Sequence, residues 1–473
     1  MAPAEIGLIG LGVMGANLAL NIAEHGSPIA VYNRTAETTA KLHTNAGALA
    51  DRIAPAASLR ELVAAIRPPR PIIIMVTAGQ AVDQQIAALR PLLSTDDILI
   101  DAGNANFRDT VRRSAEFDGS GLAFLGIGVS GGEEGARHGP SIMAGGTRKS
   151  YARVERVLTG IAAKYKSDPC CAWLGEGGAG HFVKTIHNGI EYADMQMIAE
   201  IYGILRDGLG LEPAAIGEIF ARWNKGRLDS YLIEVTAAVL SAKDAATGRP
   251  AVDIILDRAG QKGTGRWSVI EAQNLGVPAM AIEAAVAARN LSALKAEREA
   301  ADKIYGIAQG RLASADRKAL VDQLELALYA GKLSAYAQGF AVMEAASREF
   351  SWNLPMATIA KIWRAGCIIR SQFLDAIASA FPESERLSNL LVAPEFVARM
   401  KESVPVLRKT VAEAATHGLP VPALSASLAY FDSYRLGRGT ANLIQAQRDF
   451  FGAHGFERID QAGAHHGPWH GAA

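Results

Sequence analysis

The feature that most constrains the fold is a glycine-rich turn near the N-terminus. An apolar segment, Ile6–Ile9, precedes it, and a helical pattern over Val13–His25 begins inside it. In this context the first glycine permits a tight turn, the second leaves the backbone open to a pyrophosphate, and the third lets helix and strand pack closely. The start of the helix also attracts phosphate. We therefore predict a dinucleotide-binding turn, with a ligand-free glycine turn as the alternative, at Gly10, Leu11, Gly12, Val13, Met14 and Gly15.

The end of the second predicted strand, Ile29–Tyr32, bears on cofactor choice. NAD-binding chains usually place a carboxylate there to bind the ribose 2′-hydroxyl, whereas this chain has Asn33, Arg34 and Thr35. The planar cation of Arg34 can bind a 2′-phosphate. The sequence thus favours NADP over NAD, unless Arg34 is an ordinary surface arginine.

Strand and helix patterns alternate through the first third of the chain. Strands joined by single helices pair in parallel through right-handed crossovers, and near-continuous apolar strands fit a sheet covered on both faces. We predict an α/β, Rossmann-like, doubly wound domain over residues 1–178. Its further strands are expected at Ile72–Val76, Ile98–Ile100 and Leu122–Ile127, and its helices at Ala36–Asn45, Ala81–Leu92 and Arg108–Glu116.

Strand patterns almost disappear after Gly178, and helical periodicity predicts a large all-α domain over residues 179–434. This region contains a faint internal repeat, because the segments that begin at Leu211 and Asn353 share a proline followed by similar apolar positions, about 142 residues apart. Chance similarity of two amphipathic helices is the alternative. The glycine-rich residues 435–473 form a C-terminal tail that either frays or docks on another surface.

Composition excludes several classes of protein. The chain has 473 residues, 49% of them hydrophobic, and 48 basic against 48 acidic residues, which argues against a disordered chain and against a general nucleic-acid binder. Cys170, Cys171 and Cys367 fit neither a disulfide framework nor a metal site, which favours a reducing compartment. The apolar runs are too short for a membrane span, and no signal peptide is evident. We expect a cytoplasmic protein with neither a metal site nor a membrane or nucleic-acid partner.

One predicted helix carries an unusual polar stripe. Lys184, His187, Asn188, Glu191 and Tyr192 share one helical face. Such a stripe on a buried helix would line a wet cavity, and a solvated polar face is the alternative. Desolvation in a cavity lowers the pKa of a lysine and makes it a candidate general base, with the glutamate as a second proton-transfer group. The remaining faces carry apolar residues, namely Phe182, Val183, Ile186, Ile190 and Met195.

Four long segments resemble decarboxylating 6-phosphogluconate dehydrogenases, in the same order along the whole chain. The resemblance implies an NADP-dependent oxidative decarboxylation of 6-phosphogluconate to ribulose 5-phosphate and CO2, as in the pentose phosphate pathway and gluconate utilisation, without a metal. It implies that Lys184 is the general base and that Glu191 is the acid that protonates C1 of the enediol. The segments are residues 126–146 (GIGVSGGEEGARHGPSIMAGG), 178–198 (GAGHFVKTIHNGIEYADMQMI), 261–267 (QKGTGRW) and 447–454 (QRDFFGAH).

The resemblance also implies the binding residues and a homodimer. Residues matching Arg448 and His454 reach the site from the other subunit in that family, which implies shared active sites. The sugar acid would contact Asn104, Ser130, Gly131, Gly132, His187 and Asn188. Its phosphate would contact Tyr192, Lys262, Thr264, Arg289 and Arg448, with His454 nearby. Besides the residues named above, the cofactor would contact Val76, Thr77, Ala78 and Asn104.

The chain departs from the family pattern at a few positions. Thr77 stands where the family commonly has a lysine, which weakens the expectation of NADP selectivity. Ala102 and Ala144 also replace more usual residues, although Asn104 remains. Two other functions stay open, namely a β-hydroxyacid dehydrogenase that acts on another small acid and a non-catalytic NADP-binding module. Lys262, Arg289 and Arg448 favour a phosphorylated substrate, and the presence of Lys184 and Glu191 argues against the non-catalytic module.

Overall fold

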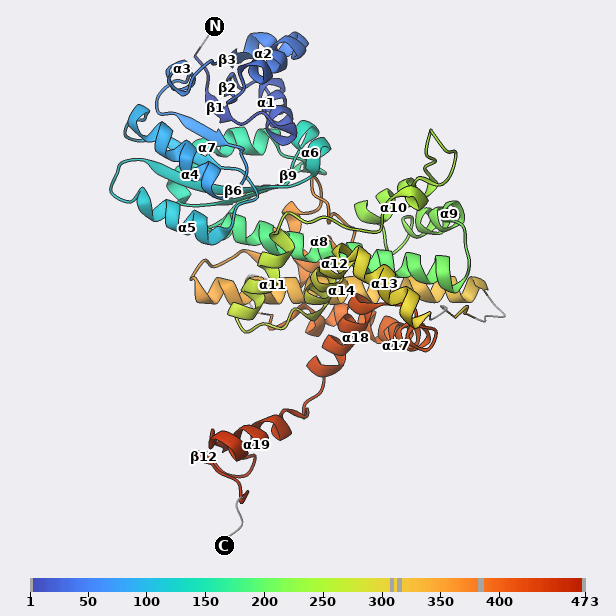
Figure 1. The fold of residues 1–473 in the computed structure, drawn as a ribbon. Coiled ribbons are helices and arrows are strands. Elements are labelled where there is room, and N and C mark those ends of the chain that lie inside the picture. Colours follow the sequence, from blue (N-terminus) through green and yellow to red (C-terminus); the bar gives the residue numbers. More distant parts are fainter. Residues whose placement is uncertain (1–2, 307–309, 313–316, 382–386, 470–473) are drawn as a thin grey trace. The chain divides into compact units, whose positions relative to one another are not determined.

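The computed structural model describes residues 3–306, 310–312, 317–381 and 387–469. The chain forms two compact units, residues 1–427 and residues 428–473. The first unit contains an α/β part, followed by a part built of helices (Figure 1). The predicted fold class is therefore confirmed, whereas the domain boundaries at residues 178 and 434 stay predictions.

The α/β part is organised around an eight-stranded sheet in the order β10-β7-β6-β5-β4-β1-β2-β3. The crossover from β3 to β4, on the far side of β1, makes it doubly wound. Its strands are β1 (Ile6–Ile9), β2 (Ile29–Tyr32), β3 (Ile53–Pro55), β4 (Pro71–Ile74), β5 (Ile98–Asp101), β6 (Ala123–Val129), β7 (Ile142–Gly145) and β10 (Cys171–Gly175). Met75 and Val76, predicted to end a strand, instead follow β4 in a loop.

The pairing of β6 with β7 is antiparallel, and every other pair in this sheet is parallel. The strands predicted from the sequence therefore pair in parallel, as expected, and the antiparallel pair involves β7, which was not predicted. The connection contains α6 (Gly132–His138), which at seven residues is about 10 Å long. This is shorter than β6, which spans about 23 Å. A helix this short does not run back along the full length of β6, which fits a next strand that returns antiparallel to it.

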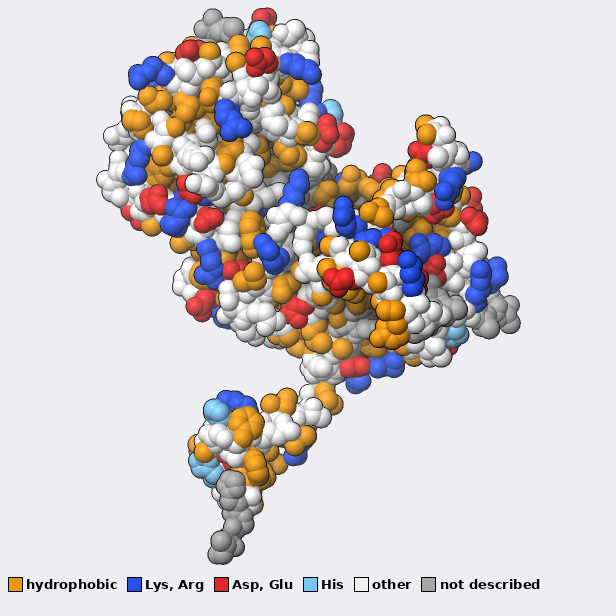
Figure 2. All heavy atoms as spheres, viewed as in Figure 1, with side chains coloured by type: hydrophobic (Ala, Val, Ile, Leu, Met, Phe, Trp, Pro, Cys, Tyr) orange, Lys and Arg blue, Asp and Glu red, His pale blue; other side chains and the backbone are white. Residues whose placement is uncertain are grey.

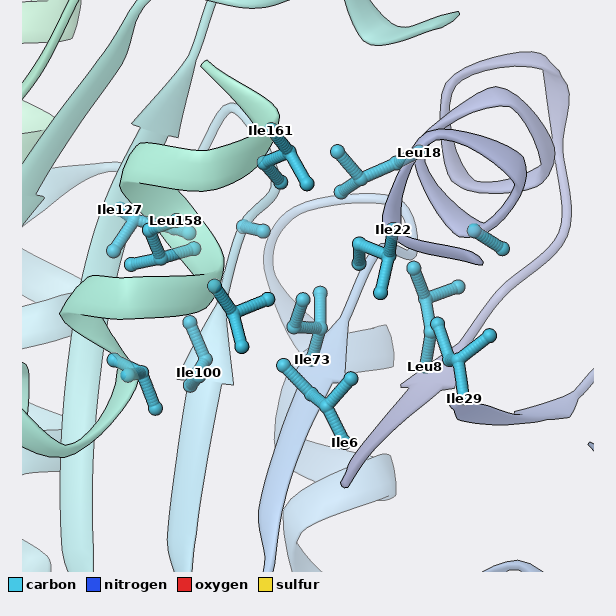
Figure 3. Packing of buried hydrophobic residues seen from close by; sticks show 14 of the residues in the cluster. Ile6, Leu8, Leu18, Ile22, Ile29, Ile73, Ile100, Ile127, Leu158 and Ile161 are labelled. Atoms are coloured by element: carbon cyan, nitrogen blue, oxygen red, sulfur yellow. The ribbon is translucent and has the colours of Figure 1, made fainter. Parts of the chain in front are cut away.

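Apolar side chains cover both faces of the sheet, which explains the near-continuous apolar strands. On one face, Leu18 and Ile22 of α1 (Val13–Glu24) and Leu158 of α7 (Arg148–Ile161) pack over the strands (Figure 3). The other face is covered from α3 and α4. The remaining helices are α2 (Ala36–Asn45), α3 (Leu59–Ala65), α4 (Gln80–Leu89) and α5 (Phe107–Glu116), with 3-10 turns at Gly47–Arg52 and Arg90–Leu92 and a small hairpin of β8 (Lys164–Tyr165) and β9 (Asp168–Pro169).

The helical part is centred on two long helices that pack together, α8 (Ala179–Gly203) and α14 (Arg317–Glu349). A π-helical turn, Ile204–Gly208, extends α8. The other helices are α9 (Pro213–Trp223), α10 (Tyr231–Ser241), α11 (Thr264–Asn274), α12 (Met280–Ala293), α13 (Lys295–Tyr305), α15 (Met356–Ile362), α16 (Leu374–Ala380), α17 (Pro394–Thr416) and α18 (Pro422–Tyr434), with 3-10 turns at Ala251–Ile254 and Leu390–Val392.

The sequence repeat corresponds to a repeat of element order. Each long helix is followed by two shorter ones, α9 and α10 after α8, and α15 and α16 after α14. The two copies touch through an antiparallel bridge between Ser230 and Ser371. Around it, the Tyr231 N–H donates to the Arg370 carbonyl and the Gln372 N–H to the Asp229 carbonyl, both at 3.1 Å. This symmetry of sequence, order and contact favours duplication over chance similarity.

Helix α8 approaches the sheet unusually closely. A Cβ on Gly128 of β6 would lie 2.4 Å from Cβ of Lys184, and one on Gly126 would lie 2.8 Å from Nδ1 of His181. On the helix side, a Cβ on Gly180 would likewise clash with backbone atoms of both β6 and β7. Glycine at these positions therefore lets α8 press the stem of Lys184 against β6.

The second unit is built around a carboxylate rather than an apolar core. It contains α19 (Ala441–Gly452), β11 (Phe456–Glu457) and β12 (Ala464–His465). Asp449 is buried and accepts hydrogen bonds from the N–H groups of Gly455 and Gly467 at 2.9 Å. It also accepts from the ring nitrogens of His466 and Trp469 at 2.6 Å. These bonds hold residues 455–469 on α19, so this segment has a defined local fold.

Candidate active site

The polar stripe of α8 lies on one face, as its spacing predicts. Lys184, His187 and Asn188 are buried, and Glu191 is partly exposed. Lys184 lies against β6 because of the glycine described above. Met195 corrects the expectation of apolar burial around the rest of the helix, since it is 40% exposed and its sulfur lies 3.9 Å from Nη2 of Arg289.

A directed chain of hydrogen bonds joins the residues of the stripe. The Lys184 amine donates to Oγ of Ser130 at 3.0 Å, and Ser130 Oγ lies 3.2 Å from Nε2 of His187. Nδ1 of His187 lies 3.1 Å from Oδ1 of Asn188, whose Nδ2 donates to Oγ1 of Thr264 at 3.0 Å. Because the amide oxygen can only accept, His187 carries its proton on Nδ1, and its Nε2 accepts from Ser130. Each hydrogen bond in the chain is therefore donated in the direction from Lys184 toward Thr264 on α11.

Burial controls the protonation of this chain. It lowers the pKa of Lys184, an effect that nearby Glu191 partly opposes. Burial, with a further contribution from the neighbouring lysine, also holds the pKa of His187 well below its usual value. A neutral imidazole agrees with its place as an acceptor for Ser130. The site thus favours an uncharged amine with a fixed hydrogen-bond partner, which is the state a general base requires.

Glu191 has the complementary property. Burial raises the pKa of its carboxyl group, whereas Lys184 and Arg289 pull that pKa down. One oxygen of Glu191 lies 3.8 Å from Nδ1 of His187. A carboxyl group with a raised pKa holds its proton to higher pH and can act as an acid. Helix α8 thus presents an amine with a lowered pKa and a carboxyl group with a raised pKa two turns apart on one face.

The loop after β6 fits closely against the helical part. Gly131 has φ +105°, and a Cβ there would lie 2.6 Å from the carbonyl oxygen of Gly366. Gly132 also has positive φ, but a Cβ there would meet open space. Ser130, the hydrogen-bond partner of Lys184, precedes these two glycines. The loop is therefore packed tightly against Gly366 at Gly131, whereas at Gly132 there is open space beside the backbone.

Three of the residues predicted to bind phosphate gather beside Glu191. The guanidinium carbon of Arg289 lies 3.7 Å from the centroid of the Tyr192 ring, and Thr264 is bonded to the stripe through Asn188. Gly265 leaves room for that ring, since a Cβ there would lie 2.4 Å from it. Lys262 is exposed two residues before the start of α11.

Three other predicted substrate residues lie on segments outside α8 and α11. Asn104 is exposed in the loop between β5 and α5. Arg448 and His454 are exposed in the second unit, where Nη1 of Arg448 donates to Oε1 of Gln445 at 3.1 Å. Their roles at the substrate stay predictions.

The glycine turn has the geometry that its sequence predicts. Gly10 has φ +96°, and a Cβ there would lie 2.4 Å from the carbonyl oxygen of Met75. A Cβ on Gly15 would lie 1.9 Å from the Gly10 carbonyl oxygen, so this glycine is required for the close packing of α1 on β1. A Cβ on Gly12 would meet nothing within 4 Å, so its backbone is open to a ligand.

A pocket of about 330 Å³ opens over this turn. The Leu11 N–H donates to Oδ1 of Asn33 at 3.0 Å and ties the turn to the end of β2. Among the predicted cofactor residues, Gly10, Gly12, Asn33, Arg34, Thr35, Val76 and Thr77 line the pocket. Leu11, Val13, Met14, Gly15, Ala78 and Asn104 are not among its lining residues.

The lining residues that were not predicted from the sequence include two glutamines of α4, Gln84 and Gln85. The buried Oε1 of Gln85 has no hydrogen-bond partner among the described residues. Polar residues in the first turns of a helix that follows a parallel strand are a signal that could have found them, because such turns face the carboxyl edge of the sheet.

Three further observations concern the described part of the chain. Within it, no cluster of three or more His, Cys, Asp or Glu side chains is arranged to hold a metal ion. In the same residues, no helix combines the length and the apolar character needed to cross a membrane. Cys170, Cys171 and Cys367 are buried free thiols.

Comparison with known proteins places this architecture in a family. Residues 5–175 match the NAD binding domain of 6-phosphogluconate dehydrogenase, and residues 180–469 match the C-terminal domain of 6-phosphogluconate dehydrogenase. The chain belongs to the 6-phosphogluconate dehydrogenase family. The family resemblance inferred from the sequence motifs is thereby confirmed over almost the whole chain.

Several individual 6-phosphogluconate dehydrogenases are similar to this chain in sequence, and one is also similar in structure. The decarboxylating enzyme of Bacillus licheniformis is 48% identical over 98% of this chain and 99% of its own length. Two Bacillus subtilis enzymes, one named NAD(+)-dependent and one NADP(+)-dependent, are each 47% identical, over 98% and 99% of this chain and 99% and 100% of their own. The Plasmodium falciparum structure, solved apo, with NADP+ and with 6-phosphogluconate, has a TM-score of 0.95 and 41% identity, covering 98% of this chain and 100% of that one.

Proposed function

We propose that this chain oxidatively decarboxylates 6-phosphogluconate to ribulose 5-phosphate and CO2, with NADP as the electron acceptor. The observation that carries the proposal is the buried amine of Lys184, whose pKa is lowered, on the same helix face as Glu191, whose pKa is raised. Family membership and the named activity of relatives that cover the whole chain support the same reaction.

In the proposed mechanism, Lys184 acts first. Its neutral amine takes the proton from the C3 hydroxyl while the C3 hydride leaves for the cofactor, whose chemistry is to accept that hydride. Ser130 holds the amine in place, and the neutral His187 in turn orients Ser130. The lowered pKa makes the free amine available without a metal or a second base.

The second half of the reaction needs an acid. The 3-keto acid loses CO2 because the ketone accepts the electron pair of the breaking C1–C2 bond, and the protonated Lys184 stabilises the resulting enediolate. Glu191 then donates a proton to the carbon that carried the carboxylate, C1 of the product. The raised pKa of Glu191 keeps that proton available.

The remaining stripe residues would bind the substrate. We propose that Ser130, Gly131, Gly132, His187, Asn188 and Asn104 hold the sugar acid. The phosphate needs several charge-assisted donors. Tyr192, Lys262, Thr264 and Arg289 would supply them on the body of the chain.

The pocket over the glycine turn suits a dinucleotide. The open backbone at Gly12 can approach a pyrophosphate, and Arg34 in the pocket wall can pair with a 2′-phosphate. Thr77, also in the wall, offers no second cation. We therefore propose NADP as the preferred cofactor, with a smaller preference over NAD than a lysine at this position would give.

We also propose a cytoplasmic homodimer with shared active sites, in which Arg448 and His454 serve the partner's substrate. In the second unit α19 exposes Leu443, Ile444, Phe450 and Phe451, and hydrophobic side chains gather on the face shown (Figure 2). Exposed apolar surface of this kind is typical of a segment that docks on another protein. A second copy of the chain is the partner that shared sites require.

The decisive experiment assays the purified chain with 6-phosphogluconate and NADP or NAD in turn, following nicotinamide reduction and CO2 release. We expect equal amounts of reduced cofactor and CO2, with a higher kcat/KM for NADP. Reduced cofactor without CO2 would favour a simple β-hydroxyacid dehydrogenase. Cofactor binding without any turnover would favour the non-catalytic module.

Shared sites are tested by complementation. Lys184→Met and Arg448→Ala chains are each expected to be nearly inactive alone. Coexpressed, they form mixed dimers in which one of the two sites has both an intact lysine and an intact partner tail. Recovery of activity supports shared sites, and no recovery despite mixed dimers would contradict them.

A further inference from the structure

A charged contact joins the α/β part to the helical part of the first unit. Nε and Nη2 of Arg108, on α5, donate to the two carboxylate oxygens of Glu271, on α11, at 2.8 and 2.6 Å. The Glu271 side chain is 4% exposed and that of Arg108 is 53% exposed. A two-pronged contact of this kind fixes orientation as well as distance.

On the α/β side, this contact holds the loop that carries Asn104. Arg108 is the second residue of α5, and its N–H donates to Oδ1 of the capping residue Asn106 at 2.9 Å. The ring of Phe107, between them, packs edge-on against Phe182 of α8 with ring centroids 5.1 Å apart. The end of this loop is therefore held by a cap, an aromatic contact and the ion pair.

On the helical side, the contact ends a row of bonds along one face of α11. Thr264, Ser268 and Glu271 are spaced four and then three residues apart, so they share that face. Thr264 accepts from Asn188, and Ser268 Oγ donates to the Thr185 carbonyl at 2.6 Å. The row runs from Thr264 at the start of α11 to Glu271, two turns along the helix, where Arg108 bonds.

We propose that Arg108 and Glu271 are positioning residues that set the spacing between Asn104 on one side of the substrate and Thr264 on the other. This rests on the proposed function, in which both flanking residues contact 6-phosphogluconate. Neither member of the pair is assigned to substrate or cofactor. The pair acts by holding two segments far apart in the sequence in the geometry that one bound molecule requires.

The test is a double-mutant cycle with Arg108→Gln, Glu271→Gln and the double variant, with kcat and KM measured for 6-phosphogluconate. Since displacement of binding groups by about 1 Å can cost up to about 100-fold, we expect each single variant to lower kcat/KM by about 10-fold. The double variant should be no worse than either single one, because one contact is lost in all three. Arg108→Lys keeps the positive charge but cannot make both hydrogen bonds of the guanidinium group. Its kcat/KM should lie between that of the wild type and that of Arg108→Gln.

Arg112→Gln is the matched control. Arg112 lies one turn further along α5, is 48% exposed, and pairs with Asp83 and Glu116 within the α/β part. It should keep kcat/KM within about twofold of the wild type, since exposed pairs contribute little. Melting temperatures of all variants are compared, and if Arg108→Gln does not fold, Arg108→Lys replaces it in the cycle.

The outcomes separate the two proposals. An active wild type with additive losses, or with pair variants that match the Arg112 control, would overturn the positioning role alone. A folded wild type that does not oxidise 6-phosphogluconate would overturn the proposed function and this inference with it.

Discussion

Among the described residues of the helical part, two lysines are buried, and their surroundings differ in kind. Lys332 of α14 is fully buried and bonds both carboxylate oxygens of Asp194 of α8, at 2.6 and 2.5 Å. Lys184 lies ten residues before Asp194 on α8. It is also buried, but it donates to the neutral hydroxyl of Ser130. Helix α8 is therefore joined to α14 by an ion pair at Asp194, and it also carries a buried lysine that bonds a neutral partner.

The difference shows how burial can serve either structure or chemistry. A buried cation that directly contacts a carboxylate is compensated and holds two helices in register. A buried amine that bonds a neutral hydroxyl is less compensated, so its pKa falls, as the proposed role of a base requires. The partner of each lysine, rather than its depth, indicates its role.

The largest expected effect is on catalysis at Lys184. Lys184→Met should lower kcat by about 10⁴-fold, because removing the general base removes a contribution of up to that size. Binding of 6-phosphogluconate should change by only a few-fold. Turnover and equilibrium binding measure the two effects separately. Near-normal turnover would contradict the proposal that Lys184, unlike Lys332, acts in the chemistry.

At Lys332 the expected effect is on stability. Lys332→Met leaves the Asp194 carboxylate buried without its partner, which should cost about 3–5 kcal/mol of unfolding free energy. Denaturant unfolding measures the loss. The double variant Lys332→Met/Asp194→Leu should recover most of it, and a single variant as stable as the wild type would show that the pair is not an anchor.

A smaller effect is expected on the pH profile through Glu191. Because the pKa of Glu191 is raised, its acid form persists above the ordinary range and is lost as pH rises through that raised pKa. Glu191→Gln should lower kcat by about 10²-fold and abolish the alkaline decline of kcat. Glu200→Gln, on the same helix but bonded to the start of α18, is the control and should keep that decline. A decline that survives in Glu191→Gln would assign it to another group.

The smallest expected effect is an increase in stability at Lys184. Its folded-state pKa is depressed, so at neutral pH the unfolded chain binds its proton more readily and folding is disfavoured. Lys184→Met removes this cost and should raise the unfolding free energy measured at neutral pH. The gain should shrink as pH approaches the pKa of the unfolded lysine. Melting curves across pH test this, and a destabilised variant would contradict it.

Much of the fold could be predicted because the signals are local. The glycine turn and the strands at Ile6–Ile9 and Ile29–Tyr32 lie where the pattern places them. Strands β7 and β10 were not predicted, since short segments such as Ile142–Gly145 resemble loops until neighbours pair with them. The antiparallel turn at β7 likewise depends on the length of a connection rather than on a residue pattern.

The site could be predicted in part for the same reason. Residues that share a face of α8 are found from spacing alone. The direction of the hydrogen-bond chain could not be predicted, because it passes through Thr264, 76 residues after Asn188. The contact between Arg108 and Glu271 spans 163 residues. Nothing in the sequence near either residue indicates the other.

By itself, the sequence determined the dinucleotide-binding turn, the helix that carries amine and carboxyl on one face, and the family to which these motifs point. Helical and strand periods and the need for glycine at close contacts act within a few residues, so they can be read along the chain. Only the tertiary structure decided which buried lysine is paired with a carboxylate and which bonds a neutral hydroxyl. Burial and the choice of partner are made by segments that meet only after folding, and these set the free energy of each charge.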